Sequence, residues 1–320
     1  MITLPHRELG RSGLQVSVVG LGCNNFGRPG SRTASQEGTT AVIDAADDLG
    51  VTLLDTADIY GGHPGQSETY LGVALAGRRD RFVLATKFGH AQGDMGIADG
   101  APKGSRAYIR AAVADSLRRL QTDHIDLYQL HTPDPVTPIE ETIGALTELV
   151  TEGTIRAFGH SNFTAEQVVE AEQAAVRLGG ARFESAQNEF SLLVRDAERE
   201  LLPSVRRYGL GFLPFFPLYN GLFTGKFTRT ERPSDTRIMR QRPHLADTAP
   251  WDTIERYEVF CAEHGVTMLS ATIGWLLAQP GLTSVIAGAT GPEQLRQNAA
   301  ASREWTPTAD QVATISGIFA

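Results

Sequence analysis

Short apolar runs rich in Val, Ile, Leu and Phe alternate along the chain with longer stretches whose apolar residues recur every three to four positions. The short runs are typical of buried β-strands, and the longer stretches are typical of amphipathic helices. Regular alternation of the two predicts parallel strands joined by crossover helices. The expected strands are Val16 to Leu21, Val51 to Asp55, Phe82 to Lys87, Ile125 to His131, Ile155 to Ser161, Phe183 to Asn188, Gly211 to Phe216, and Thr283 to Ala287.

Helical periodicity is clear between these strands. It predicts helices over Ser35 to Leu49, Arg106 to Leu120, Ile139 to Glu152, Thr164 to Leu178, Glu198 to Tyr208, and finally residues 307–318. Eight strand and helix units in a chain of 320 residues suit a closed barrel better than an open sheet. We therefore expect a single (β/α)8 TIM barrel domain over residues 1–320, with a short C-terminal helix.

Three further segments stand outside this alternation. Leu4 to Ser17 contains Gly10 and Gly13, which predicts a small β-hairpin that closes the bottom of the barrel. Residues 88–105 and 218–250 form long connections after strands, where loops of α/β barrels carry function.

Composition excludes several classes of function. A formal charge of -8 with scattered Lys and Arg disfavours nucleic acid as the partner. The N-terminal segment lacks a signal-peptide pattern and no apolar run is long enough for a membrane helix, so a cytoplasmic location is expected. The two cysteines, Cys23 and Cys261, indicate neither a disulfide framework nor a metal pair. The oligomeric state stays open.

Four polar residues lie at or just after the ends of the second, third and fourth expected strands: Asp55, Tyr60, Lys87 and His131. Strand C-termini form the active face of such a barrel. A tyrosine with a pKa of ~10 needs a depression of about three units, or ~4 kcal/mol, to donate a proton easily at neutral pH. A lysine at ~4 Å contributes about that much at an effective dielectric constant of ~20.

The remaining two groups fit the same chemistry. Asp55 on the neighbouring strand would keep a buried Lys87 protonated. His131 can orient a substrate oxygen toward Tyr60. Such a site polarises and protonates a carbonyl, but no side chain can supply the hydride, so a nicotinamide cofactor is implied.

The motifs that carry these residues resemble the aldo-keto reductase family over almost the whole chain. They are GRSGLQVSVVGLGCNNFG at 10–27, LDTADIYG at 54–61, LATKFG at 84–89, LHTPD at 130–134 and GPEQLRQNAAA at 291–301. The resemblance implies reversible, NAD(P)-dependent reduction of an aldehyde or ketone to an alcohol, without a metal. It assigns Tyr60 as general acid, Lys87 and Asp55 as its tuning pair, and His131 as the substrate-orienting group.

The same resemblance implies a cofactor site. Ser161, Asn162 and Gln187 would hold the carboxamide, and Phe215 would stack on the nicotinamide ring. The other expected cofactor residues are Gly22, Cys23, Asn24, Phe216, Pro217, Leu218, Gly221, Lys226, Gly288, Thr290, Gln294, Gln297 and Asn298.

Selection between NADPH and NADH depends on a segment that departs from the family's best-known pattern. The usual Lys, Ser and Arg clamp for the 2′-phosphate is replaced by Gly288, Ala289 and Gln294. This version resembles the potassium-channel β-subunits and a related bacterial branch, in which the lysine of a GKF segment and a loop arginine can bind the phosphate. NADPH is therefore the expected cofactor, NADH is possible, and the candidates are Lys226 with one of Arg229, Arg232, Arg237 or Arg240.

Other interpretations remain open. Asp55 is also typical of a strand-end turn, Ser161 or Asn162 of a helix cap, and Phe215 of a barrel wall. A barrel metallohydrolase would use Asp55, Asp58, His131, Asp134 and His160, although Lys87 would repel the cation. A dinucleotide-binding Gly motif at 20–25 is disfavoured because its sixth position is Asn25. An NADPH-binding barrel that regulates a partner with little turnover is the main functional alternative.

Overall fold

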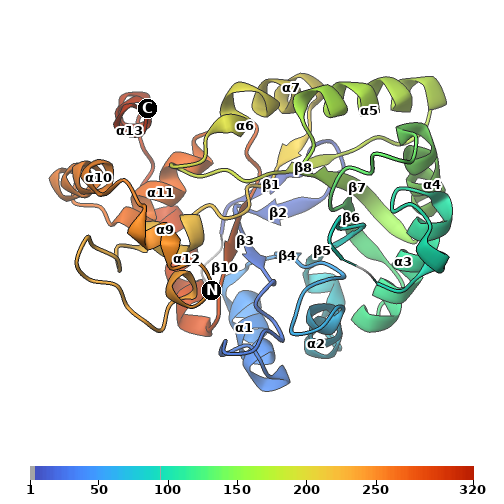
Figure 1. Ribbon diagram of the computed structural model, residues 1–320, viewed down its shortest axis with the longest axis horizontal. Helices are drawn as coiled ribbons and strands as arrows, with labels where there is room; N and C mark the ends of the chain where they lie inside the picture. The colour runs from blue at the N-terminus through green and yellow to red at the C-terminus, as the bar shows by residue number, and fades with distance from the viewer. Residues whose placement is uncertain (1–3, 94) are drawn as a thin grey trace.

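A computed structural model describes residues 4–93 and 95–320. Eight parallel strands lie side by side in one curved sheet, surrounded by helices (Figure 1). Their order is β10 (Val285–Gly288), β3 (Val19–Gly22), β4 (Leu53–Asp55), β5 (Val83–Phe88), β6 (Ile125–Leu130), β7 (Ile155–Ser161), β8 (Ser185–Gln187) and β9 (Gly211–Phe212).

Backbone hydrogen bonds join β9 to the residues that lead into β10. Phe212 donates to the Gly281 oxygen at 3.0 Å, and Thr283 donates to the Phe212 oxygen at 2.9 Å. An isolated parallel bridge also pairs Phe212 with Leu282. These contacts close the sheet and confirm the expected (β/α)8 barrel.

Helices follow the strands and bury their apolar faces against the outside of the sheet. They include α1 (Gln36–Leu49), α2 (Gln66–Ala74), α3 (Arg106–Leu120), α4 (Ile139–Thr151), α5 (Ala165–Leu178), α6 (Asp196–Arg199), α7 (Leu201–Tyr208), α11 (Met268–Leu277) and α12 (Pro292–Glu304). Two more, α10 (Trp251–Glu263) and α13 (Ala309–Ile318), pack on each other beside the barrel. Within the described residues, no helix combines the length and apolarity needed to cross a membrane.

The N-terminal hairpin closes the bottom of the barrel, as expected. It consists of β1 (His6–Glu8) and β2 (Gln15–Ser17), which pair antiparallel. Its fully buried Leu9 and Val16 pack into the interior against Leu53 and other inward residues of the strands. Gly10 has a φ of 60°, and a Cβ there would lie 2.2 Å from the Glu184 oxygen, so this turn requires glycine.

Several strand expectations need correction. Val16 and Ser17 belong to the hairpin and not to the first barrel strand, because they pair with Arg7 and His6. The strand expected over Gly211 to Phe216 is regular only to Phe212, since Pro214 cannot donate a ladder hydrogen bond. The second, sixth and eighth expected strands begin at Leu53, Ser185 and Val285, each two residues later than predicted.

The two long connections are ordered in different ways. In residues 88–105, the Lys103 ammonium donates to the backbone oxygens of His90, Ala91 and Gly93, and so it ties the loop to itself. Residues 218–250 are less irregular than expected. They contain η3 (Tyr219–Thr224), α8 (Arg237–Gln241) and α9 (His244–Asp247), which are anchored by buried apolar side chains such as Ile238 and Ala246.

Candidate active site

A cavity of about 1350 Å³ opens at the C-terminal ends of the strands. Asp55, Tyr60 and His131 line it, and Lys87 lies fully buried beside Asp55. The barrel therefore brings the four expected residues together, because inward positions alternate along each strand and Asp55, Lys87 and His131 all occupy them. The long loops supply His90 and Gln92 to one part of the wall and α8 to another.

Asp55 and Lys87 form a buried ion pair. The Lys87 Nζ lies 2.8 Å from each Asp55 carboxylate oxygen and 2.7 Å from the Thr56 backbone oxygen. Burial acts to lower the pKa of Lys87, but the charge of Asp55 and its hydrogen bonds outweigh burial, and the net pKa is raised. Lys87 is therefore a permanent cation at neutral pH, as expected from the sequence.

Tyr60 contacts this cation. The Lys87 Nζ lies 5.2 Å from the centroid of the Tyr60 ring. The turn that carries Tyr60 is held by backbone hydrogen bonds from Tyr60 to Ala57 and from Ser67 to Tyr60.

The expected depression of the Tyr60 pKa is wrong for this state. Burial raises the pKa of the hydroxyl, and Lys87 only partly offsets this. Low polarity disfavours the phenolate more than one ammonium favours it. The hydroxyl thus stays protonated, which suits a proton donor.

His131 is a neutral imidazole. Burial, followed by the charges of Lys87 and His90, lowers its pKa well below the usual value. Its ring packs edge-on to Tyr60, with centroids 5.8 Å apart, and to His90, with centroids 4.6 Å apart. The buried His131 Nδ1 has no hydrogen-bond partner in the described part of the protein. Because His131 also lines the cavity, its ring can take part in a hydrogen bond with a ligand there.

Ser161, Asn162 and Gln187 form one hydrogen-bonded network beside the ion pair. The Ser161 hydroxyl donates to the Gln187 backbone oxygen at 2.7 Å, and the Asn162 amide donates to the His131 oxygen at 2.9 Å. The Gln187 amide donates to Asp55 at 2.9 Å. Helix α5 is capped by Thr164, so the interpretation of Ser161 or Asn162 as its cap is wrong.

Phe215 and Phe216 lie beside the end of β8, where the Phe215 backbone N–H donates to the Asn188 oxygen at 3.1 Å, and their rings meet edge to face with centroids 5.2 Å apart. Both line the cavity, so Phe215 is more than a core residue. Phe216 has a φ of 50°, an uncommon conformation for a non-glycine residue. The guanidinium groups of Arg237 and Arg242 lie 5.2 and 5.0 Å from its ring centroid.

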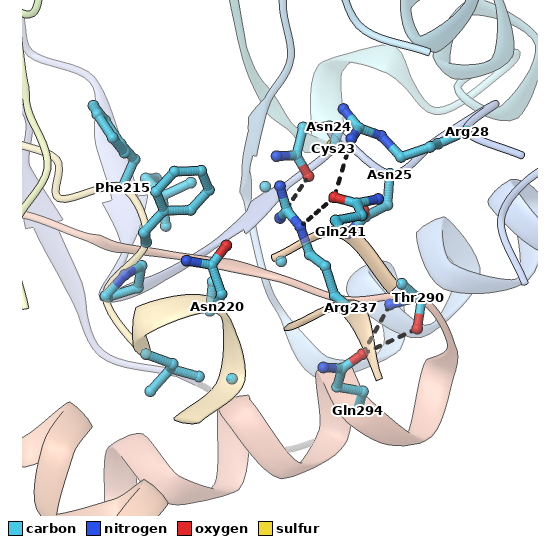
Figure 2. Close-up of a pocket in the computed structure, with 18 of the residues that line it drawn as sticks. Cys23, Asn24, Asn25, Arg28, Phe215, Asn220, Arg237, Gln241, Thr290 and Gln294 are labelled. Atoms are coloured by element: carbon cyan, nitrogen blue, oxygen red, sulfur yellow. Dashed lines mark hydrogen bonds between the residues drawn. The ribbon is translucent and has the colours of Figure 1, made fainter. Parts of the chain in front are cut away.

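The wall continues to the start of α12, where the Thr290 backbone N–H donates to the Gln294 side chain at 2.9 Å (Figure 2). No side chain caps the N-terminus of α12 within the described residues. The expected residues that line the cavity are Gly22, Cys23, Asn24, Ser161, Asn162, Gln187, Phe215, Phe216, Pro217, Leu218, Gly221, Lys226, Gly288, Thr290, Gln294 and Gln297. Asn298 is buried on α12 and does not line it.

Six cations on the cavity wall have no carboxylate at ion-pair distance within the described part of the chain: Arg28, Arg32, Lys226, Arg237, Arg240 and Arg242. By contrast, Arg229 pairs with Asp252 and Glu255, and Arg232 pairs with Asp247, both outside the cavity wall. Of the four loop arginines considered from the sequence, Arg237 and Arg240 are therefore the ones that line the cavity. An excess of cations on one wall favours an anionic ligand.

Sequence reasoning missed several residues of this site. Gln129 is fully buried, donates to Asp55 at 3.4 Å, and sits two positions before His131, so strand alternation could have revealed it. Arg28, Arg32 and Arg242 carried no motif that would have distinguished them from surface charges.

The ligand set of a metallohydrolase does not assemble. Asp134 accepts hydrogen bonds from Gly104, Val136 and Thr137 in its own surroundings. His160 stacks on Phe163 on the outer side of β7. Across residues 4–93 and 95–320, no three His, Cys, Asp or Glu side chains gather as a metal site.

Comparison with known proteins gives concordant matches. The profile described as "Aldo/keto reductase family" matches residues 18–319. An uncharacterized oxidoreductase, YrpG, of Bacillus subtilis (strain 168) is 36% identical over 305 residues, covering 92% of this chain and 89% of that protein. A probable voltage-gated potassium channel subunit beta of Oryza sativa subsp. japonica is 32% identical, with 92% and 90% covered. Probable aldo-keto reductase 1 of Glycine max is 33% identical, with 91% and 82% covered.

Proposed function

Because the chain belongs to the aldo/keto reductase family, we propose that it is an oxidoreductase that uses NADPH to reduce an aldehyde or ketone to an alcohol. The observation that carries this proposal is the buried Asp55–Lys87 pair beside Tyr60 and His131 on the wall of one cavity. The reaction is reversible in principle, and the physiological direction depends on the ratio of reduced to oxidised cofactor.

The residues of the cavity fit a dinucleotide. The volume of the cavity exceeds what a small carbonyl compound alone needs. Gly22 and Gly288 have no side chains, which leaves the cavity surface shallow there. An added Cβ would lie 3.3 Å from the Ile286 side chain at Gly22 and 3.6 Å from the Asn25 side chain at Gly288. Buried polar atoms of two cavity residues, Arg28 Nε and Asn220 Oδ1, have no partner among the described residues and can bind a polar ligand.

We assign the parts of the cofactor to groups of side chains. Ser161, Asn162 and Gln187 would hold the carboxamide, and Phe215 would cover the ring. The remaining wall from Lys226 to the uncapped N-terminus of α12 would bind the phosphates, since helix N-termini and unpaired cations both attract anions. When bound, the reduced nicotinamide supplies the hydride that the carbonyl carbon accepts.

The chain itself performs the acid catalysis. Neutral His131 orients the carbonyl oxygen, and the Tyr60 hydroxyl donates its proton to that oxygen as negative charge develops. Lys87 stabilises the resulting phenolate, and Asp55 keeps Lys87 charged in a position where burial disfavours an ammonium. The raised pKa of Tyr60 is compatible with this role because the donor must hold its proton until the transition state.

Turnover tests the proposal directly. Purified protein with NADPH and 4-nitrobenzaldehyde should lose absorbance at 340 nm. Tyr60→Phe should lower kcat by about 10²-fold or more, because general acid catalysis contributes that much, while the NADPH dissociation constant stays nearly unchanged.

Two outcomes would contradict this assignment. An equal loss of cofactor binding in Tyr60→Phe would show that the hydroxyl has a binding role. Tight NADPH binding by the wild type without turnover of any carbonyl would favour a regulatory barrel instead.

A further inference from the structure

One layer of the barrel interior holds an amide beside the Asp55–Lys87 pair. The strand register places Lys87 on β5 next to Gln129 on β6, and it continues through Gly159 on β7 to Ser185 on β8 (Figure 1). Gln129 is fully buried and does not line the cavity. Any effect of Gln129 on catalysis therefore passes through its neighbours and not through direct contact with a ligand.

Three donors converge on one oxygen of the Asp55 carboxylate. Asp55 Oδ1 accepts from the Lys87 ammonium at 2.8 Å and from the amides of Gln187 and Gln129 at 2.9 and 3.4 Å. Asp55 Oδ2 accepts from Lys87 alone among the described residues, also at 2.8 Å. The three donors come from three different strands, so together they fix the rotation of the carboxylate and the direction from which the ammonium approaches it.

The layer makes room for this amide at Gly159. A Cβ at position 159 would lie 2.0 Å from the Ser185 hydroxyl oxygen and 3.2 Å from Cγ of Gln129, so a larger residue would displace both side chains. The Gln129 side-chain oxygen has no hydrogen-bond partner in the described part of the chain. A buried polar atom without a partner destabilises the folded state, and local costs of this kind are typical of functional sites.

The donors matter because a buried ion pair can lose both of its charges. Moving one proton from the ammonium to the carboxylate gives a neutral pair, and an environment of low polarity favours that state. Hydrogen bonds to the carboxylate favour its charged form and so oppose the transfer. Only a charged Lys87 can stabilise the phenolate that Tyr60 forms when it gives its proton to the substrate.

We propose that Gln129 is a positioning residue of the reductase reaction, which acts through Asp55 and keeps Lys87 charged. This inference rests on the reductase function proposed above and adds to it a residue outside the cavity. Gln187 makes the same bond to Asp55, but it also lines the cavity, where a bound ligand can engage it. Gln129 is therefore the amide donor to Asp55 that no ligand in the cavity can withdraw.

Gln129→Met tests this role with a side chain of similar length that cannot donate a hydrogen bond. With NADPH and 4-nitrobenzaldehyde it should lower kcat by about tenfold, the scale of one hydrogen bond to a charged group. The KM for the aldehyde and the NADPH dissociation constant should change little, because Gln129 does not line the cavity.

Gln279→Met is the matched control. Gln279 is also buried, but its amide donates to the Trp275 backbone oxygen at 3.0 Å and to neither member of the ion pair. The same substitution at this position should leave kcat at the wild-type value.

Gln129→Glu provides a pH dependence that a purely structural residue would not give. While protonated, the introduced carboxyl can donate its O–H to Asp55, and once ionised it repels that carboxylate. Burial and the charge of Asp55 should raise the pKa of the introduced carboxyl from ~4.3 toward neutrality. The ratio of its kcat to that of the wild type should therefore fall as the pH rises from about 6.5 to 8.

The ionisable groups around the pair do not produce this fall. The pKa values of His131 and His90 are lowered below 6.5, and those of Tyr60, Lys87 and Cys23 are raised, so these groups keep their charge over that range. Asp58, with a pKa of about 7, titrates in both proteins and cancels in the ratio.

Urea unfolding without cofactor tests the contact between Gln129 and Asp55 independently of turnover. If the amide acts on the charge of Asp55, Gln129→Met should lower stability less in an Asp55→Asn background than in the wild type, or even raise it there.

Four results would overturn the proposal. They are an unchanged kcat in Gln129→Met, an equal loss of kcat in Gln279→Met, a pH profile of Gln129→Glu parallel to that of the wild type, and additive losses of stability in Gln129→Met and Asp55→Asn. In each of these cases the reductase function still stands. If the wild type reduces no carbonyl compound, the reductase function fails, and the role of Gln129 in it fails as well.

Discussion

The ion pair between Asp55 and Lys87 should contribute to folding in a way that a mutant cycle can isolate. Lys87 is fully buried, and Asp55 is 4% exposed. Replacing Lys87 by Met leaves a carboxylate without its cation, and replacing Asp55 by Asn leaves an ammonium without its anion. Each single change should lower the free energy of unfolding by about 3–5 kcal/mol, the usual cost of an uncompensated buried charge.

The double variant, Asp55→Asn with Lys87→Met, should recover much of this loss. The introduced amide oxygen can still accept the 2.9 Å hydrogen bond that Gln187 donates to Asp55, and the introduced methionine fills the space of the lysine stem without a charge. The two changes together should therefore cost no more than one alone, which corresponds to a coupling of roughly 3 kcal/mol or more. Against a total stability of about 5–15 kcal/mol, such losses are readily measured.

Urea unfolding at pH 7, followed by circular dichroism and tryptophan fluorescence, would provide the free energies of unfolding of the wild type, the two single variants and the double variant. The Asp55→Asn loss should also shrink toward pH 9, because an uncompensated Lys87 can release its proton. Additivity of the two single changes within about 0.5 kcal/mol would refute the reasoning, since it would mean that the charges do not depend on each other. The double variant should fold but lack turnover, because no ammonium then faces Tyr60.

Three more predictions concern pH and cofactor choice. Burial and then Glu68 raise the pKa of Asp58 to about 7, so the folded chain retains a proton that the unfolded chain releases above pH ~4. The contribution of Asp58 to the free energy of unfolding is therefore fully present below pH ~4 and is lost as the pH rises through 7. The wild type should lose roughly 4 kcal/mol through this group between pH 4 and pH 8 in urea unfolding, and Asp58→Asn should not show that loss. Parallel profiles of unfolding free energy against pH for the wild type and Asp58→Asn would contradict this reasoning. Burial lowers the pKa of His160 to about 3, so its contribution is present above pH ~6.5 and is lost as the pH falls toward 3. His160→Phe keeps a ring against Phe163 and should make the free energy of unfolding depend less on pH between 6.5 and 3. An unchanged midpoint of acid unfolding would count against a buried neutral imidazole. Lys226→Ala should weaken NADPH about tenfold and NADH much less in fluorescence titrations, whereas an equal effect would remove Lys226 from the 2′-phosphate.

Much of the fold was accessible from the sequence because the relevant signals are local. Helix α3 begins and ends where periodicity indicates, at Arg106 and Leu120, and Ser105 caps it through its side chain. Strand β7 likewise matches its expected bounds. The hairpin over Leu4 to Ser17 was also foreseen from its two glycines, but the sequence placed Val16 and Ser17 in the first barrel strand as well, and only their pairing with β1 assigns them to the hairpin alone.

The candidate site likewise contains residues that the sequence could place and residues that it could not. Asp55, Lys87 and His131 could be placed because strand ends converge in a barrel whatever the details of packing. The meeting of Arg28 with Arg237 could not be predicted, since both donate to Gln241, which is 213 positions away from Arg28 and lies on a connection whose helices depend on a few buried anchors. Their lack of carboxylate partners among the described residues is a property of the assembled cavity.

By itself, the sequence determined the alternation of strands and helices, the barrel, and the four residues that meet at the C-terminal ends of its strands. These depend on side-chain periodicity and on the order of elements, which short-range physics controls. Only the tertiary structure decided the protonation of Tyr60 and which cations face the cavity. Those properties depend on desolvation and on distances between segments far apart in the chain, and both exist only once the barrel has closed.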